Sequence, residues 1–144
     1  MPKLTNKGVN ALNAQTPYLA NSILPNLLGY DIDHFTAFES GKPVNIMRVR
    51  YNTQEAMIIT PTKTEDFSSS YIKSITITSD LVQNPFNLSI GDTLDANAFS
   101  KCKTADEIVC KNKGFENIKI IFTKNKNGTY ILKEFVWAED DSKF

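Results

Sequence analysis

Residues 117–137 read NIKIIFTKNKNGTYILKEFVW, and this stretch decides the fold class. Two runs rich in isoleucine, phenylalanine, tyrosine and valine, residues 117–124 and 129–137, flank the four residues NKNG. β-Branched and aromatic side chains favour strands. Asn127-Gly128 suits the tight turn of a hairpin, because such turns need residues that tolerate positive φ. The stretch therefore predicts a C-terminal antiparallel hairpin.

Strand-like runs also precede this hairpin. Residues 30–39 (YDIDHFTAFE) and 44–51 (VNIMRVRY) are separated by SGKP, which supplies the glycine and proline of a turn. AMIIT, residues 56–60, and SYIKSITITS, residues 70–79, continue the pattern, and the polar stretch between them indicates an exposed loop. Strand-like runs outnumber helical ones about seven to two, which favours an antiparallel sheet or sandwich.

Two short helices are expected. Thr16 can cap a first helix, Pro17 fits its first position and Gly29 its end, which predicts a helix over residues 17–28 that Pro25 kinks. A second, brief helix is expected from Asp92 or Thr93 to about Ser100. The predicted fold is mainly β: an antiparallel β-sandwich-like domain with an N-terminal helix and one further short helix. The apolar face expected for the first helix consists of Leu19, Ile23, Leu24 and Leu27.

Length and charge bound the possible functions. The chain has 144 residues, which suits a single domain, and Lys+Arg and Asp+Glu number 16 each. A balanced charge gives no field that would steer the chain to nucleic acid, so no nucleic-acid partner is expected. The apolar stretch 18–30 is interrupted by polar residues and is shorter than the roughly 20 residues of a membrane-spanning helix. The first ten residues lack the apolar core of a signal peptide.

Catalytic and cofactor patterns are absent from the sequence. The six glycines never form a phosphate-binding loop, and no nucleophile lies in a recognisable signature. Asp31, Asp33 and His34 are close in sequence, but a strand places His34 on the opposite face from the two carboxylates. A solvated strand edge explains them better than an acid–base pair or a cation site. We therefore predict no enzyme, no catalytic residue, no metal site and no cofactor.

Two groups of residues allow both a functional and a structural interpretation. Arg48 and Arg50 lie on one face of a strand, where they are a candidate contact for an anion or a partner, although an exposed sheet face explains them equally well. The aromatic residues fit either the lining of a cavity between sheets or an ordinary core. These aromatic residues are Phe35, Phe38, Phe86, Phe99, Phe115, Phe122, Phe135 and Trp137.

The two cysteines, Cys102 and Cys110, leave three readings open. A zinc site would need more ligands than two cysteines and the single histidine provide. Two buried free thiols are compatible with a reducing compartment. A disulfide requires the chain to fold back between them, with Cys102 at the end of the second helix and Cys110 in a following strand.

Several segments resemble the family of RpoE-regulated lipoproteins, small envelope proteins of Gram-negative bacteria that contain a domain of unestablished function. The resemblance is carried by TNKGVNALNAQTPY (5–18), IGDTLDANAFSKC (90–102), the VC pair at 109–110, NIKIIF (117–122) and Trp137. It extends over residues 4–137 and leaves 138–144 as a polar tail. In the family, glycine usually follows the glycine-valine pair, where this chain has Asn10, and the lipid-bearing cysteine that the family carries after its signal is absent.

The resemblance implies a location in the periplasm, with an outer-membrane anchor in the full-length form. Because that compartment is oxidising, it also implies a disulfide between Cys102 and Cys110. The expected function is a noncatalytic domain that acts by contacting an envelope protein or a cell-wall component. The alternative is a β-sandwich that binds a small apolar ligand or a lipid.

Overall fold

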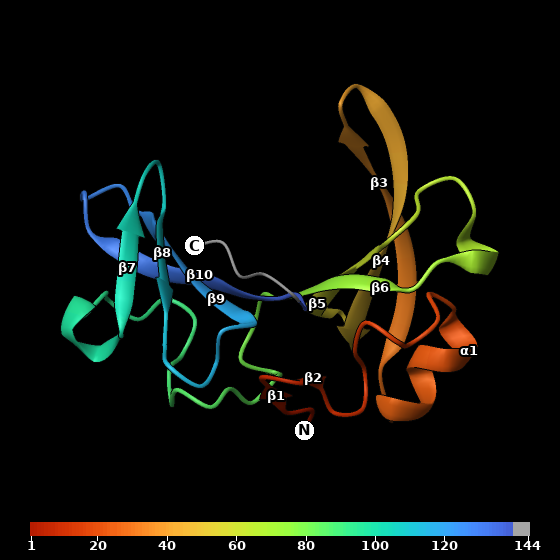
Figure 1. Ribbon diagram of the computed structural model, residues 1–144, viewed down its shortest axis with the longest axis horizontal. Coiled ribbons are helices and arrows are strands. Elements are labelled where there is room, and N and C mark those ends of the chain that lie inside the picture. The colour runs from red at the N-terminus through yellow and green to blue at the C-terminus, as the bar shows by residue number, and fades with distance from the viewer. Residues whose placement is uncertain (140–144) are drawn as a thin grey trace.

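The computed structural model describes residues 1–139 and confirms the mainly β, antiparallel fold class. An eight-stranded antiparallel sheet has the strand order β3-β4-β5-β6-β10-β9-β8-β7 (Figure 1). Its strands are β3 (Asp31–Glu39), β4 (Lys42–Tyr51), β5 (Gln54–Pro61), β6 (Ile72–Ile77), β7 (Lys101–Thr104), β8 (Ile108–Lys111), β9 (Ile118–Lys124) and β10 (Tyr130–Trp137). The C-terminal hairpin predicted from residues 117–137 is formed by β9 and β10. Most of the expected polar tail, residues 138–144, lies outside the described residues.

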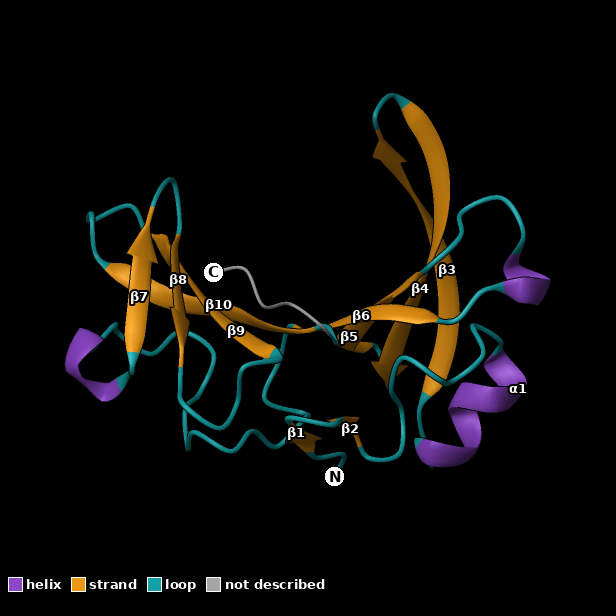
Figure 2. Cartoon of the chain, viewed as in Figure 1, coloured by secondary structure: helices purple, strands orange, loops and turns teal. Residues whose placement is uncertain are grey.

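The sheet is strongly curved, and its two ends rise on the same side (Figure 1). Three irregularities in strand pairing contribute to this shape, at Val49/Arg50, at Thr60/Pro61 and at Leu132/Glu134. Such bulges bend a strand and increase its local twist. The N-terminal segment and the crossing segment 78–100 lie beneath the sheet, on the side away from its raised ends (Figure 2). We call this side the covered face and the opposite side the open face.

The hydrophobic core lies between the covered face and these two segments. The N-terminal segment contributes Leu4, Val9 and Leu12, which are fully buried, and the crossing segment contributes Val82. Alternation along the strands sends one set of side chains into this core and leaves the other set on the open face. The sheet residues of the core include Met47, Val49, Met57, Ile59, Ile75, Ile77, Ile120, Phe122, Phe135 and Trp137.

The N-terminus forms a small sheet that the sequence analysis did not predict. β1 (Leu4–Thr5) and β2 (Gly8–Val9) have two residues each and pair as an antiparallel hairpin. Gly8 has a φ of 133°, and a Cβ atom there would lie 1.9 Å from the Leu12 carbonyl oxygen. Both the backbone conformation and the close approach therefore require glycine at this position.

The predicted helix over residues 17–28 is much shorter than expected. It consists of α1 (Ala20–Ile23), followed by a single 3-10 turn, η1 (Leu24–Asn26). Pro17 does not begin the helix because it pairs with Tyr71 in an isolated β-bridge, and Pro25 cannot donate the hydrogen bond that would continue the α-helix. Ile23 and Leu27 are buried as expected, whereas Leu19 is 43% exposed.

The second predicted helix, from Asp92 or Thr93 to Ser100, is also reduced to one 3-10 turn, η3 (Ala96–Ala98). Asp95 is its cap, and its side chain accepts a hydrogen bond from the Asn97 N–H. Another 3-10 turn, η2 (Phe67–Ser69), lies in the loop between β5 and β6. Within residues 1–139, no helix is long and apolar enough to cross a membrane.

Candidate functional site

The two arginines singled out from the sequence lie together on the open face and are paired with an acidic neighbour. Arg48 donates from Nε to Asp33 Oδ1 at 2.9 Å and from Nη2 to Asp33 Oδ2 at 3.2 Å. Arg50 reaches Asp33 Oδ2 at 3.2 Å and donates to the Thr53 carbonyl oxygen at 2.7 Å. The β3–β4 register causes this cluster, because Asp33 is directly opposite Arg48. The carboxylate that Arg48 and Arg50 bind in the structure is therefore that of Asp33, in the same chain.

The arginines keep the Asp33 carboxyl ionised. The hydrogen bond from Arg48, assisted by the one from Arg50, lowers the pKa of Asp33 below its ordinary value. The Arg48 guanidinium also lies over the Phe35 ring, 5.4 Å from its centroid. His34 is exposed on the opposite side of β3, and Asp31 is exposed at its start. The strand geometry thus separates His34 from the two carboxylates, as alternation predicts.

The middle of the open face carries a half-buried carboxyl group. Burial raises the pKa of Glu134, and the charges of Glu107 and Glu55 raise it further against the opposing effect of Lys133. Lys133 forms an ion pair with Glu107 at 3.7 Å. Among residues 1–139, no cluster of three or more histidine, cysteine, aspartate or glutamate side chains is arranged to hold a metal ion.

Cys102 and Cys110 form the disulfide that the family resemblance implied. The expected position of Cys102 was wrong: it lies in strand β7, directly opposite Cys110 in β8, and not at the end of a helix. The chain reverses between them through a turn in which the Ala105 N–H donates to the Glu107 carbonyl oxygen. Because opposed residues of antiparallel strands lie within disulfide reach, the bond fastens the edge strand β7 to β8.

Most of the aromatic residues belong to the core. Phe122, Phe135 and Trp137 are buried. Ring contacts join Phe86 to Phe115 and Phe135, and Phe99 to Phe122. Phe38, by contrast, is 75% exposed on β3.

Residues that carry the family resemblance also meet in a structural cluster. Asn6 accepts a hydrogen bond through Oδ1 from the Asn117 N–H at 2.8 Å, and its carbonyl oxygen accepts from Trp137 Nε1 at 3.0 Å. The Asn117 side chain also donates to the Asn6 carbonyl oxygen. This cluster joins the N-terminal hairpin to the start of β9 and the end of β10, so its role is to close the fold.

A groove that the sequence analysis missed lies on the open face between β4 and the β5–β6 loop. Its main pocket has a volume of 660 Å³, within the range of about 300–1,000 Å³ that is typical of ligand pockets. A second pocket of 390 Å³ shares Glu39, Val44, Thr64 and Glu65 with it and continues the groove toward the tip of the β3–β4 hairpin. We call the two pockets together the β4 groove. It is lined by Glu39, Ser40, Lys42, Pro43, Val44, Ile46, Thr60, Pro61, Thr62, Lys63, Thr64, Glu65, Asp66, Lys73 and Ser74.

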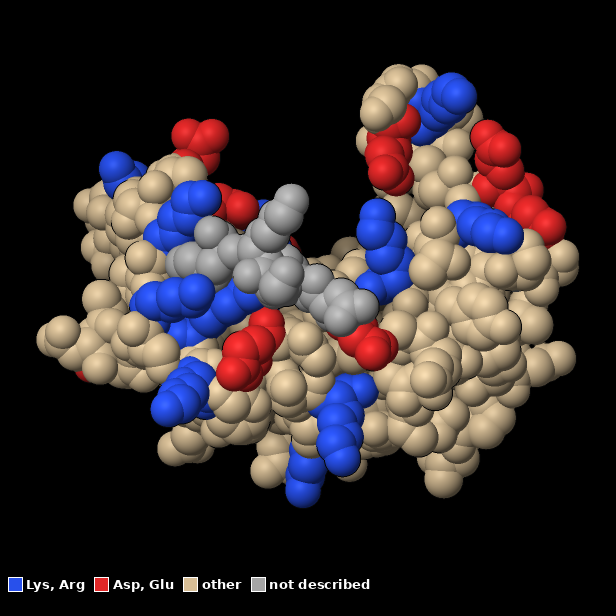
Figure 3. Space-filling view, viewed as in Figure 1, with Lys and Arg blue, Asp and Glu red and all other residues tan. Residues whose placement is uncertain are grey.

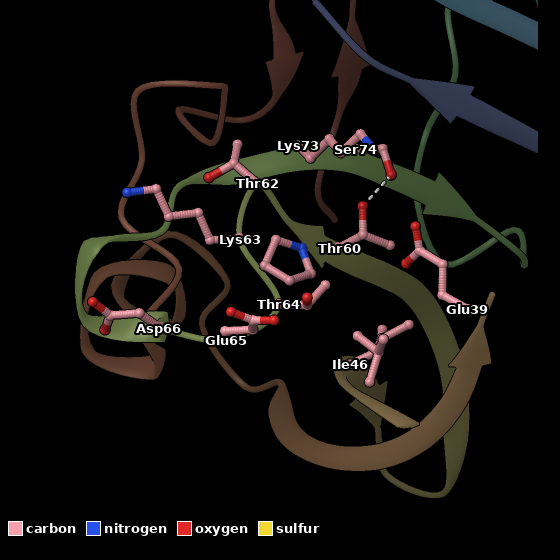
Figure 4. Close-up of a pocket in the computed structure, with 12 residues that line it drawn as sticks. Glu39, Ile46, Thr60, Thr62, Lys63, Thr64, Glu65, Asp66, Lys73 and Ser74 are labelled. Carbon is pink, nitrogen blue, oxygen red and sulfur yellow. Dashed lines mark hydrogen bonds between the residues drawn. The ribbon is translucent and has the colours of Figure 1, made fainter. Parts of the chain in front are cut away.

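The lining of the β4 groove is rich in hydroxyl groups. Thr60 and Ser74 share a hydrogen bond across β5 and β6, and Ile46 lies on the other side of the space from the Thr64 and Glu65 loop (Figure 4). Asp66 accepts hydrogen bonds from Ser68 and Ser69, which lower its pKa and hold the loop in shape. Acidic and basic side chains both line the groove, and both charge signs are also interspersed over the side of the molecule that Figure 3 shows. The groove thus offers many polar contacts to a ligand, and its electrostatic potential is not dominated by one charge sign.

Two prolines mark the groove once the pairing of β4 with β5 is known. Pro43 lies in β4, and Pro61 ends β5. Proline cannot donate to a strand ladder, so it occurs at sheet edges and bulges. Two prolines at the same end of neighbouring strands indicate that the strands part there.

Comparison with known proteins shows the fold alone. No protein-family model matches the chain, and no curated protein sequence matches it. The chain is similar in structure to the uncharacterized protein yfeY from Escherichia coli, with a TM-score of 0.69 and 21% sequence identity. The match covers 95% of this chain and 99% of the yfeY chain. The architecture described above is therefore shared with a solved structure over nearly its whole length.

Proposed function

We propose that this domain is a noncatalytic module of the bacterial cell envelope and that it acts by binding a protein partner in the β4 groove. The groove itself carries the proposal. It is open to solvent on the open face, it has the volume of a ligand pocket, and its hydroxyl groups and mixed charges suit polar backbone and side-chain groups.

The disulfide supports an extracytoplasmic location for this function. Cys102 and Cys110 are bonded to each other, and such bonds persist in oxidising compartments and are rare in the cytosol. The resemblance to RpoE-regulated lipoproteins supports the same location, with a lipid anchor in the full-length form. The alternative, a carrier of a small apolar ligand, fits the groove less well, because Val44, Ile46 and Pro61 are outnumbered in its lining by charged and hydroxyl side chains.

Photo-crosslinking in the bacterial periplasm tests the proposal. A photoreactive amino acid replaces Thr64, which is exposed and lines both pockets of the groove. The matched control carries it at Leu28, which is 86% exposed beside η1. We expect a light-dependent adduct to one protein at position 64 that is absent at position 28. Adducts of equal yield at both positions, or an adduct at 64 that contains glycan and no second protein, would contradict a protein partner in the groove.

A further inference from the structure

The β4 groove exists because β4 and β5 part at a defined residue. Their pairing runs from Tyr51↔Gln54 to Met47↔Ile59, and residues 42–46 of β4 pair only with β3. If the same register continued by two residues, Asn45 would lie opposite Pro61. Because Pro61 has no N–H, it cannot donate to the Asn45 carbonyl oxygen, and the ladder stops. Figure 1 shows the β3–β4 hairpin rising away from β5 and β6 beyond this point.

A buried hydroxyl group holds the strands apart at the last pair. Tyr18 Oη accepts a hydrogen bond from the Met47 N–H and donates one to the Ile59 carbonyl oxygen, both at 2.7 Å. It therefore stands between two backbone groups that would otherwise bond directly. Tyr18 is fully buried, so this wedge is a fixed part of the core.

The unpaired edge of β4 faces the space between β4 and β5, next to the groove that Pro43, Val44 and Ile46 line. The Met47 N–H points toward β5, as its bond to Tyr18 shows. Backbone groups alternate in direction along a strand, so those of Asn45 also point toward β5, whereas those of Val44 and Ile46 point toward β3. Pro43 contributes a carbonyl group on the same side but no N–H. Among the described residues, β5 provides Asn45 with no partner in register.

We propose that the β4 groove binds an extended peptide segment of the partner protein, which pairs as an added strand with β4 at residues 42–46. This inference rests on the proposed function. The observations that point to an extended peptide are the unpaired backbone groups and the shape of the space. Five residues of β4 extend over about 16 Å at 3.3 Å per residue, which is room for a peptide of similar length. Its backbone would bond Asn45, and its side chains on one face would meet Val44, Ile46 and the hydroxyl groups of Thr60 and Ser74.

The chain offers an unusually clean test, because one backbone donor can be removed without disturbing the rest of the sheet. Asn45→Pro deletes the N–H that points toward β5 and leaves the β3–β4 ladder intact, since Val44 and Ile46 carry that ladder. Thr36→Pro is the matched control. Thr36 is directly opposite Asn45 in β3, is likewise exposed, and by the same alternation directs its N–H to the outer edge of the sheet. Asn45→Ala controls for the loss of the asparagine side chain.

The probe is a phage-displayed library of linear heptapeptides, selected on the intact, oxidised protein. A selected peptide is then synthesised, and its affinity is measured by titration calorimetry. We expect Asn45→Pro to weaken binding about tenfold, which corresponds to about 1.4 kcal/mol. Thr36→Pro and Asn45→Ala should stay within about twofold of wild type, because both keep the backbone donor that bonds the peptide. The Asn45 amide of the wild-type protein should also become protected from hydrogen exchange when the peptide binds, and the Thr36 amide should not.

The outcomes separate this inference from the proposed function. If the library yields no peptide that binds, or if binding protects the Thr36 amide and not that of Asn45, strand addition to β4 is wrong. The crosslink from position 64 provides the second measurement. If the protein adduct forms equally well in Asn45→Pro, the proposed binding of a protein partner stands and pairing with β4 is wrong. If the wild-type protein forms no adduct, the proposed binding of a protein partner is itself wrong. If Asn45→Pro does not fold, hydrogen exchange on the wild-type protein decides.

Discussion

At the scale of single residues, Tyr18 shows how one polar atom shapes a region of the sheet. Its hydroxyl group satisfies one donor and one acceptor between β4 and β5, and burial raises the pKa of Tyr18 to about 12. The sequence predicts a helix for the segment around Tyr18 and indicates no role for its hydroxyl group. A phenylalanine would fill nearly the same volume but would leave the Met47 N–H and the Ile59 carbonyl group without partners.

We predict that Tyr18→Phe lowers the free energy of unfolding by about 1–3 kcal/mol, the usual cost of leaving a buried polar group unsatisfied. Urea denaturation measures this change. Tyr71→Phe is the control, because Tyr71 is 47% exposed and this change should cost little. Equal stability of wild type and Tyr18→Phe would show that the hydroxyl group is not a structural wedge.

The raised pKa of Tyr18 predicts a pH dependence. The folded state favours the neutral hydroxyl group, so the stabilisation is complete below the ordinary pKa of 10.0 and is lost as pH rises toward about 12. The stability advantage of wild type over Tyr18→Phe should therefore shrink between about pH 10 and pH 12. Denaturation curves of both proteins across this interval measure it, and a constant difference would be inconsistent with burial of an un-ionised Tyr18.

At the scale of elements, the β7–β8 hairpin depends on its disulfide more than the central strands do. β7 has only four residues, lies at the edge of the sheet and buries little. The Cys102–Cys110 bond closes a short loop, and the chain-entropy account assigns such a loop about 2–3 kcal/mol.

We predict that Cys102→Ser with Cys110→Ser lowers the free energy of unfolding by about 2–3 kcal/mol and leaves the fold intact. Hydrogen exchange should accelerate in β7 and much less in β6 and β10, because the central strands keep both neighbours. Alkylation of the unfolded, nonreduced wild-type protein from an oxidising compartment should find no free thiol. Two alkylated cysteines, or a double variant that fails to fold, would contradict this assignment.

At the scale of the whole molecule, the eight strands, the N-terminal hairpin and the crossing segment enclose one continuous hydrophobic core. Asn6 links the N-terminal hairpin to β9 and β10 at the opposite end of the sequence. Within residues 1–139, the buried hydrophobic residues of both halves of the sheet belong to one cluster, so we expect the chain to unfold as a single domain.

We predict one cooperative unfolding transition. Trp137 is the only tryptophan of the chain and is 1% exposed, so its fluorescence reports on the core, while far-ultraviolet circular dichroism reports on the strands. The two signals should give coincident denaturation curves, as expected for a small two-state domain. Separate midpoints would show that the two ends of the sheet unfold independently.

The sequence by itself determined the fold class and the main strands. Residues 117–137 become β9 and β10, and the runs from residue 30 to residue 79 become β3 to β6, because alternating apolar residues and turn residues are local signals. The sequence overestimated both helices, since the bridge of Pro17 to Tyr71 and the bridge of Thr93 to Ile131 depend on partners that are distant in the sequence. The tertiary structure alone brought Asp33 to Arg48 and Arg50, and it alone placed Tyr18 where β4 and β5 part. The β4 groove could not be predicted because its prolines become meaningful only when the register sets Pro61 opposite Asn45, and register is a property of paired strands rather than of either strand.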